Sequence, residues 1–564
     1  MNFIDKAINA IDPIKGAKRA VARKTIEILN SGYSDGGASF TKNALKGFTA
    51  KSTSPLFDID ANHKTLVSRS RSLYMTAPIA TSAIKTTRTN VVGSGLKLKA
   101  RIDYEYLGIS SEEAQKIEIQ IEREFSLWAD TQECDALGIN NFYEMQALFL
   151  MGELLNGDGF CLRKYETPTP RMPYGLRLQL VEADRVCTPN EIAIGVGNNP
   201  YITYGVDKNT KNEIYSGVEI DKNGKVVAYH ICNQYPNAPL VGQFTTPEWT
   251  RVPVIGSQTG LRNVLHMFEP ERAEQRRGVP VLAPVIETLK QLTRYTDAEL
   301  MAAVISGMYT VFIKTDNPTD MPFGEALPQD LEPIDVSEHD YQLGNGAINV
   351  LGTNESIQIA DPKRPATSFN AFVTSLSKQI GSALEIPQEL LLKEFNSSYS
   401  ASRAALLEAW KVFRMRRENL ANTFCQPVYE MFLTEAVASG RIKCNGFFTD
   451  PIIKKAWCGA SWNGPAPGMV DPVKEVQAAK MRVEEGFSTR EEETMGLTGG
   501  NYNNNAKQLK IENEMLNEAK SAFLVSKQEG GTYQPQKPAD DKDKNEGKEE
   551  KEDAKSDNDS DSGK

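Results

Sequence analysis

The sequence has few features of a disulfide-bonded, metal-binding or membrane protein. Its seven cysteines are odd in number and form no Cys-x-x-Cys pair, and its four histidines are scattered. We therefore expect reduced, buried thiols and no metal site. No run reaches about 18 uninterrupted apolar residues, and the first residues lack the apolar core of a signal peptide. We expect a soluble protein of cytoplasmic origin that does not enter a membrane.

Sequence motifs for catalysis are also missing. The chain has no G-x-x-x-x-G-K-[ST], no H-E-x-x-H and no G-x-S-x-G pattern. Residues 82–85 and 375–378 match S-x-x-K, but the only Ser-Asp-Asn occupies 556–558 in the acidic tail. A four-residue pattern alone is weak evidence, so we interpret both segments as helix surface. We predict no catalytic, cofactor-binding or metal-binding residues, which favours a structural protein over an enzyme.

The charge balance excludes one further class. The chain has 64 basic and 74 acidic residues, a net charge of −10. A protein that coats nucleic acid presents a basic surface. The acidic balance argues against that class, but it is compatible with a protein past which DNA slides.

The two ends of the chain differ from its centre. Residues 1–60 form a basic arm and linker, in which 5–30 has the pattern of an amphipathic helix that Pro13 interrupts. Residues 531–564 form an acidic tail with too little apolar surface to offset the entropy of ordering, so we expect disorder there. Because 564 residues exceed one compact core, we expect several domains between these ends.

Residues 61–277 have a mixed α/β pattern. We predict helices over 63–90, 111–128 and 141–156 and a strand around Leu96–Ala100. From 175 onward strands dominate, and 214–232 is a hairpin candidate whose Asn-Gly turn supplies the positive φ that such turns need.

Two long helices then flank an insert. The first is expected over 278–307, with Pro280 in its first turn, and the second over 367–390. Between them, 308–366 carries predicted strands at 309–313 and 348–351. An apolar stripe runs along one face of the first helix, and we expect neighbouring subunits to bury it. The stripe residues are Val281, Val285, Leu289 and Leu292.

A polar loop over 391–402 leads into a third long helix. This helix is expected over 403–438 with a kink at Pro427, and strands are expected to follow it up to 470. Its arginines at 414, 416 and 417 favour ion pairing over phosphate contact. Residues 471–530 carry further helices, one of which starts at a capping box, Ser488-Thr489-Arg490-Glu491.

Ordered blocks of residues over about 60–500 resemble the lambda-like family of tailed-bacteriophage portal proteins. One block alone is weak evidence, but the whole series in this order is specific. The blocks are Arg69–Arg71 with Pro78, Asn90–Leu96, Trp128, Asp135–Gly138, Gly152-Glu153, Leu178–Val186, Gly217–Asp221, His266–Phe268, Arg272–Pro280, Tyr399–Leu407 and Trp462–Pro472.

The resemblance implies an α+β portal fold of wing, stem, clip and crown, assembled as a ring of twelve subunits around a DNA channel. By position, 61–277 corresponds to the wing, 278–307 and 367–390 to the stem helices, and 308–366 to the clip. Residues 391–402 correspond to the tunnel loop, 403–470 to the kinked wing helix and following strands, and 471–530 to the crown.

The resemblance also implies partners and a location. The ring would occupy one vertex of the virion capsid after assembly in the host cytoplasm, without contact to a membrane. It would meet major capsid and scaffold proteins, dock the large subunit of the terminase motor, conduct double-stranded DNA for packaging and ejection, and later hold the head–tail connector. The missing ATP motif agrees with a motor that is a separate protein.

The loop offers hydroxyl and amide groups without charge. Such groups can contact phosphates weakly and release them, whereas a ring of lysines would add affinity through counterion release. We expect the loop to contact DNA in the channel without sequence specificity, and a plain surface connector is the alternative. The loop residues are Asn396, Ser397, Ser398, Tyr399 and Ser400.

Two other functions stay open at this point. One is a capsid-associated processing enzyme, either a protease or a nuclease. It would need paired carboxylates, or a nucleophile and a base, that come together in the folded chain although no sequence motif shows them. The other is a monomeric nucleic-acid-binding adaptor, and the basic arm is the only sequence feature that supports it.

Overall fold

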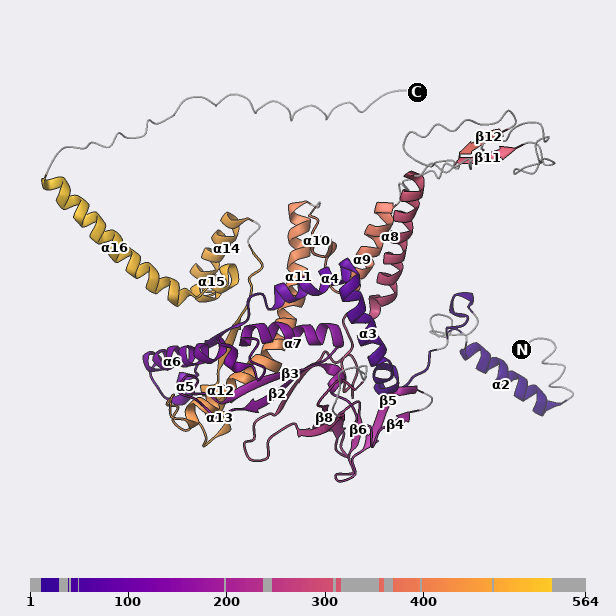
Figure 1. Ribbon diagram of the computed structural model, residues 1–564, viewed down its shortest axis with the longest axis horizontal. Coiled ribbons are helices and arrows are strands. Elements are labelled where there is room, and N and C mark those ends of the chain that lie inside the picture. The colour runs from indigo at the N-terminus through magenta and orange to yellow at the C-terminus, as the bar shows by residue number, and fades with distance from the viewer. Residues whose placement is uncertain are drawn as a thin grey trace, which may run out of the picture. The chain divides into compact units, whose positions relative to one another are not determined.

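The structure is a computed structural model (Figure 1), and its chain divides into two compact units, Met1–Pro472 and Val473–Lys564. The described residues are 12–29, 39, 42–48, 50–196, 199–236, 246–307, 311–315, 355–359, 369–395, 398–468 and 471–529. The acidic tail over 531–564 therefore lies outside the described residues.

The basic arm contains a helix, as predicted, but Pro13 begins it instead of interrupting it. Helix α2 spans Pro13–Leu29. The carboxylate of Asp12 accepts hydrogen bonds from the amides of Ile14 and Lys15, each at 3.2 Å. A proline in the first turn removes only an amide that has no partner within the helix, so this position tolerates it.

Four helices form the first part of the larger unit: α3 (Ala61–Thr76), α4 (Pro78–Val91), α6 (Ser111–Ala129) and α7 (Phe142–Asn156). The last two confirm the prediction. The single helix predicted over 63–90 is wrong, because Ala77 is extended and Pro78 starts a new helix. A residue before proline is disfavoured in the helical region, which explains the break.

Three antiparallel sheets accompany these helices. The first has the order β10-β2-β3, and α7 lies along β2 (Figure 1). The second runs from β4 to β9, each strand pairing with the next, and the third pairs β1 with β13. The strands are β1 Lys97–Ala100, β2 Gly159–Tyr165, β3 Leu176–Val181, β4 Ile194–Val196, β5 Asn199–Val206, β6 Glu213–Tyr215, β7 Val218–Ile220, β8 Val226–Cys232, β9 Trp249–Pro253, β10 Val264–Met267 and β13 Ala460–Asn463.

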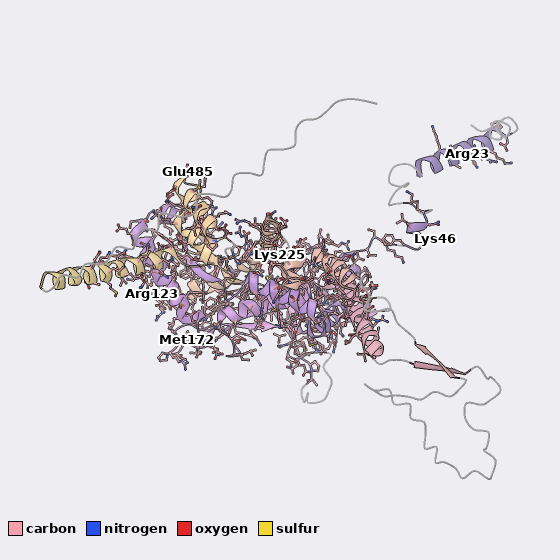
Figure 2. All side chains as sticks on the ribbon, turned by 90° about the horizontal axis from the view of Figure 1, so that it is seen from above. Arg23, Lys46, Arg123, Met172, Lys225 and Glu485 are labelled. Atoms are coloured by element: carbon pink, nitrogen blue, oxygen red, sulfur yellow. The ribbon has the colours of Figure 1, made fainter. Side chains whose placement is uncertain are left out.

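The predicted hairpin is confirmed. Strands β7 and β8 pair antiparallel, and the turn between them has Gly224 at φ +80°. Lys225, labelled in Figure 2, lies at the end of this turn, where its amide donates to the carboxylate of Asp221 at 3.0 Å. The Asn-Gly signal therefore placed this turn correctly.

Aromatic side chains from distant parts of the chain meet in the main core. The ring of Phe125 in α6 meets the ring of Phe432 edge to face at 5.2 Å, and Phe149 in α7 stacks on Phe424 at 4.4 Å. The indole of Trp128 donates to the carbonyl of Leu176 at 2.9 Å. Residues around 424–432 therefore close the same core that the early helices begin.

The third long helix is interrupted by a π-helical turn that lies just before Pro427, where the kink was predicted. Helix α11 (Tyr399–Leu420) passes through the π turn η7 (Ala421–Cys425) into α12 (Gln426–Ala438), which has its proline in the first turn. The predicted start at 403 is therefore four residues late. The strands expected after it are corrected to one short helix, α13 (Pro451–Trp457), and the single strand β13.

The second unit consists of helices in its described part: α15 (Arg490–Thr498) and α16 (Tyr502–Glu529), together with α14 (Pro472–Glu484), which begins at the unit boundary. The predicted capping box is shifted by one residue, since Thr489 and Glu492 form it. The guanidinium of Arg482 pairs with the carboxylate of Glu493 at 2.6 Å and joins α14 to α15.

Short helical turns connect the elements named so far. They are η2 Asn43–Leu45, η3 Leu56–Asp60, α5 Tyr104–Leu107, η4 Gln132–Cys134 and η5 Ala183–Arg185.

Candidate functional site

The two long helices of the candidate site pack side by side (Figure 1). Helix α8 spans Ile286–Gly307 and α9 spans Phe369–Ala383. The predicted start at 278 is wrong, because only a 3-10 turn, η6 (Ala283–Val285), precedes α8. The second predicted helix also ends early: Glu385 has φ +58°, and a separate short helix, α10 (Gln388–Leu392), follows Pro387.

The apolar stripe at the start of α8 belongs to the core of this chain. Leu289 is 1% exposed, Val285 and Leu292 are buried as well, and Val281 packs against the same core. The expectation that only neighbouring subunits bury this stripe is therefore wrong. The reason is geometric, since this end of α8 lies within the core that α3, α7 and α9 complete.

The other end of α8 leaves apolar side chains uncovered in the single chain. Leu300 is 66% exposed, Met301 58% and Val304 45%, and Phe372 on α9 is 46% exposed. We call Leu300, Met301, Val304 and Phe372 the outer patch. Large apolar groups that cluster on a surface commonly mark an interface.

The insert between the two helices carries an antiparallel strand pair. Strand β11 (Val311–Thr315) pairs with β12 (Glu355–Ile359), with Val311 opposite Ile359. The first predicted strand, 309–313, overlaps β11. The second, 348–351, and the rest of the insert over 316–354 lie outside the described residues.

The structure divides the candidate DNA-contact loop. Asn396 and Ser397 lie outside the described residues, Ser398 precedes the first residue of α11, and Tyr399 and Ser400 stand in its first turn. The polar loop is therefore shorter than 391–402, because both ends are helical. The carbonyl of Leu391 accepts the hydroxyl of Ser82 at 2.7 Å, which fixes α10 to α4.

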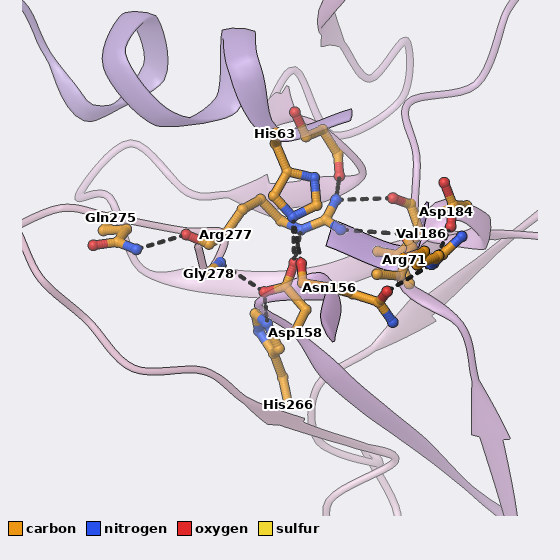
Figure 3. A network of polar contacts seen from close by, with 12 residues as sticks. His63, Arg71, Asn156, Asp158, Asp184, Val186, His266, Gln275, Arg277 and Gly278 are labelled. Atoms are coloured by element: carbon orange, nitrogen blue, oxygen red, sulfur yellow. Dashed lines mark hydrogen bonds and ion pairs between the residues drawn. The ribbon is translucent and has the colours of Figure 1, made fainter. Parts of the chain in front are cut away.

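A buried polar cluster holds the segment that leads into α8 (Figure 3). Each carboxylate oxygen of Asp158, just before β2, has two nitrogen neighbours. Oδ2 accepts a hydrogen bond from Arg277 Nε at 2.7 Å and lies 3.1 Å from His63 Nε2, which also lies 3.0 Å from the carbonyl oxygen of Asn156. Oδ1 accepts the amide of Gly278 at 2.7 Å and His266 Nε2 at 2.9 Å. We call His63, Asp158, His266, Arg277 and Gly278 the joint cluster.

Arg277 extends this cluster to neighbouring backbone. Its guanidinium donates to the carbonyls of Val186 at 3.0 Å, Ser216 at 2.7 Å and Ala183 at 3.1 Å. Its Nε is bonded to Asp158, so every nitrogen of the guanidinium has an acceptor. A planar fork with fixed donors suits such a site, which a lysine would not satisfy.

Close backbone contact completes the joint. A Cβ added to Gly278 would stand 1.8 Å from the carbonyl oxygen of Gly157, so no larger residue fits there. Three residues on, the amide of Val281 donates to the carbonyl of Leu154 at 3.1 Å. The sequence block Arg272–Pro280 carries the family resemblance, but nothing in its pattern predicted this cluster.

Burial and pairing set the charges of the cluster. Burial alone would raise the pKa of Asp158, but Arg277 and the two histidines outweigh it and hold that pKa well below its usual range. Burial lowers the pKa of His266 in spite of the nearby carboxylate. A neutral His266 fits its contacts, because Nε2 donates to Asp158 while Nδ1 lies 3.1 Å from the Tyr229 hydroxyl.

The arginines of α11 mostly contact protein groups. Arg416 lies 3.6 Å from the buried carboxylate of Glu153 and 3.2 Å from that of Glu269. It therefore has ion-pair partners, as predicted, but they lie in other elements of the same chain and not in its own helix or in another subunit. Arg417 donates to the carbonyls of Val91 at 2.9 Å and Asn90 at 2.8 Å, at the end of α4. A cation is favourable there, because helix ends expose carbonyl oxygens.

One other group has the residue types of a metal site. Ligand atoms of Asp207, Glu219 and His230 lie within 4.8 Å of one another. The Glu219 carboxylate, however, already binds the Arg251 guanidinium at 2.7 and 2.9 Å and also accepts Thr210 and Asn212. Arg251 thus supplies the positive charge that a metal would bring, so we interpret this group as structural.

In the first S-x-x-K segment the Ser82 hydroxyl donates to the carbonyl of Leu391, and Lys85 is exposed. In the second segment Ser375 and Lys378 are both exposed. In the described helices, none is long and apolar enough to cross a membrane.

Comparisons with known proteins agree on one family. The family model described as "Phage portal protein, lambda family" matches residues 41–417. The chain is 24% identical over 482 residues to the portal protein of Escherichia phage N15 and to portal protein B of Escherichia phage lambda. Each of these alignments covers 82% of this chain and 86% of the relative.

A probable portal protein of Halomonas phage phiHAP-1 is 23% identical over 428 residues, which cover 75% of each chain. Among solved structures, a chain from the virion of a native gene transfer agent particle matches with a TM-score of 0.41 and 12% identity. That match covers 77% of this chain and 93% of the other. A chain from the neck of the empty particle, computed with C6 symmetry, has a TM-score of 0.41 and 13% identity, and the match covers 77% and 94%.

Proposed function

This chain belongs to the lambda family of phage portal proteins, whose model matches residues 41–417, and we propose how its described elements serve the ring and the DNA channel. The resemblance found in the sequence is confirmed. The protein is a portal protein with an α+β portal fold, and it acts at the phage portal vertex.

We assign the stem to α8 and α9 and the crown to α14–α16. The wing comprises the helices and sheets over 61–277 together with α11–α13 and β13, and the clip is the insert over 308–366. This assignment follows the order of the elements and the position of the β11–β12 pair between two packed helices.

The outer patch carries the proposal that the stem helices assemble side by side in a ring of twelve. One chain leaves four large apolar side chains uncovered on two adjacent helices. Burying them between neighbours removes apolar area from water at about 25 cal/mol per Å². A lone subunit gains none of this stabilisation.

In this proposal DNA passes through the ring without base recognition. The loop around Asn396 and Ser397 contacts its phosphates, and the net charge of −10 per chain limits tight binding. The clip docks the large terminase subunit and later the head–tail connector. The outer surface meets major capsid and scaffold proteins during assembly in the host cytoplasm, and the ring remains in the virion.

The enzymatic and adaptor alternatives have no observation in their favour. The portal family is structural, which agrees with the prediction that this chain is not an enzyme, and the Ser82 hydroxyl of one S-x-x-K segment is bonded to main chain. A monomeric adaptor would leave the outer patch exposed to water.

Mass photometry of the full-length protein tests the proposal. We expect a species near twelve times the chain mass of 62.4 kDa. A protein that stays monomeric at micromolar concentration, with and without DNA, would contradict the ring.

A further inference from the structure

A second carboxylate lies beside the joint cluster, and one of its two oxygens has no hydrogen-bond partner. Asp60 is the last residue of η3, directly before α3, and only 4% of its surface is exposed. Its Oδ1 atom is buried and has no hydrogen-bond partner. The sequence shows only an acidic residue before a helix, so this burial comes from the tertiary structure.

Burial outweighs the cationic groups around Asp60. Arg277 and Arg276 from the segment before α8 and His63 from α3 favour its ionised form, whereas Asp158 before β2 opposes it. Arg277 donates its Nε hydrogen bond to Asp158, and its other two nitrogens donate to three backbone carbonyls. An ionised Asp60 would thus stand near ionised Asp158 without a donor for Oδ1, which is costly in a buried site.

We propose that Asp60 is a proton-controlled latch on the joint cluster: its protonated form keeps the root of α8 closed on α3 and β2, and its ionised form loosens that contact. Closed means that the amides of Gly278 and Val281 keep their bonds to Asp158 and Leu154. In the open form the turn at η3 separates from 276–278 and Asp60 ionises in water. That this motion turns a stem against a wing rests on the proposed function.

The direction of the effect follows from linkage. Burial is the main cause that raises the pKa of Asp60, from 3.8 to about 6. A carboxyl whose pKa is raised in the closed form stabilises that form below its open-form pKa, and this stabilisation is lost as the pH rises through about 6. With these two pKa values the open-to-closed ratio rises about tenfold between pH 5 and pH 7.

Amide hydrogen exchange of the full-length protein measures this ratio at Gly278 and Val281. Intrinsic exchange also depends on pH, so each rate is divided by the rate in Asp60→Asn at the same pH. We expect this quotient to rise about tenfold from pH 5 to pH 7. A quotient that stays flat or falls would overturn the latch.

Two controls keep the test decisive. Asp58→Asn changes a carboxylate in the same turn that lies at the surface, beside Arg272, and whose pKa is lowered. It should leave the pH dependence of wild type unchanged, and loss of that dependence would refute a role specific to Asp60. If Asp60→Asn does not fold, the exchange rates of Gly278 and Val281 in wild type are divided by that of the buried Phe432 amide, with the same expected rise and the same refuting result. Because this readout does not require rings, it separates the latch from the proposed assembly.

Discussion

The two ends of α8 carry similar apolar residues and differ in what buries them. At the start, Leu289 is 1% exposed and packs in the core of its own chain, whereas Leu300, three turns later, is 66% exposed. The first end therefore contributes to the folding of one subunit. The second end stays exposed among the described residues, so it adds little to the folding of the described chain. The comparison separates residues that fold the chain from residues that we propose assemble it.

Charged substitutions in the outer patch should disrupt ring assembly without disrupting the fold of the single chain. We expect Leu300→Asp with Val304→Asp to convert rings into folded monomers, since a carboxylate buried without a partner costs several kcal/mol at each interface. Mass photometry reports the rings, and circular dichroism the fold of the monomer. Leu300→Met with Val304→Ile keeps the patch apolar and should keep the rings. Intact rings in the charged variant would show that the patch is not an interface.

Shortening a side chain at the buried end of α8 should have the opposite effect and lower the stability of the single chain. Leu289→Ala removes a core side chain, and such changes cost about 2–5 kcal/mol of unfolding free energy. Denaturant unfolding of the full chain, monitored by fluorescence, measures the loss. Leu300→Ala is the matched control and should change monomer stability by about 0.5 kcal/mol or less. Equal losses in the two variants would remove the distinction between the two ends.

A third prediction concerns the polar loop residues that we propose contact DNA. Asn396→Lys with Ser397→Lys should slow DNA translocation or ejection most at low salt, because each added phosphate contact steepens the salt dependence. Ring assembly should be unaffected, and Asn396→Gln with Ser397→Thr serves as the uncharged control. Equal rates for all three proteins across the salt range would show that the loop does not face DNA.

The smallest effect is expected from the acidic tail. Deletion of 538–564 should leave the number of subunits per ring and the thermal midpoint unchanged, because this segment has too little apolar surface to join a core. A deletion variant that forms no rings would mean that the tail takes part in assembly.

Local patterns in the sequence predicted local structure well. The Asn-Gly turn of the β7–β8 hairpin and the periodicity of α6 and α7 depend on neighbours within a few residues, and both were confirmed. Element boundaries next to prolines were less accurate. Pro78 split one predicted helix, and Pro280 precedes α8 instead of starting it, since proline fits several positions near a helix start.

The sequence by itself determined the family, the α+β class and the order of two long helices around a β-containing insert, because these follow from motif order and periodicity. The tertiary structure alone decided which apolar residues of α8 are core and which stay exposed in the described chain. It alone also brought His63, Asp158, His266 and Arg277 together, and buried Asp60 beside them. The physical reason is that periodicity marks a face of a helix, whereas burial and pairing depend on segments far apart in the chain, whose meeting no local pattern encodes.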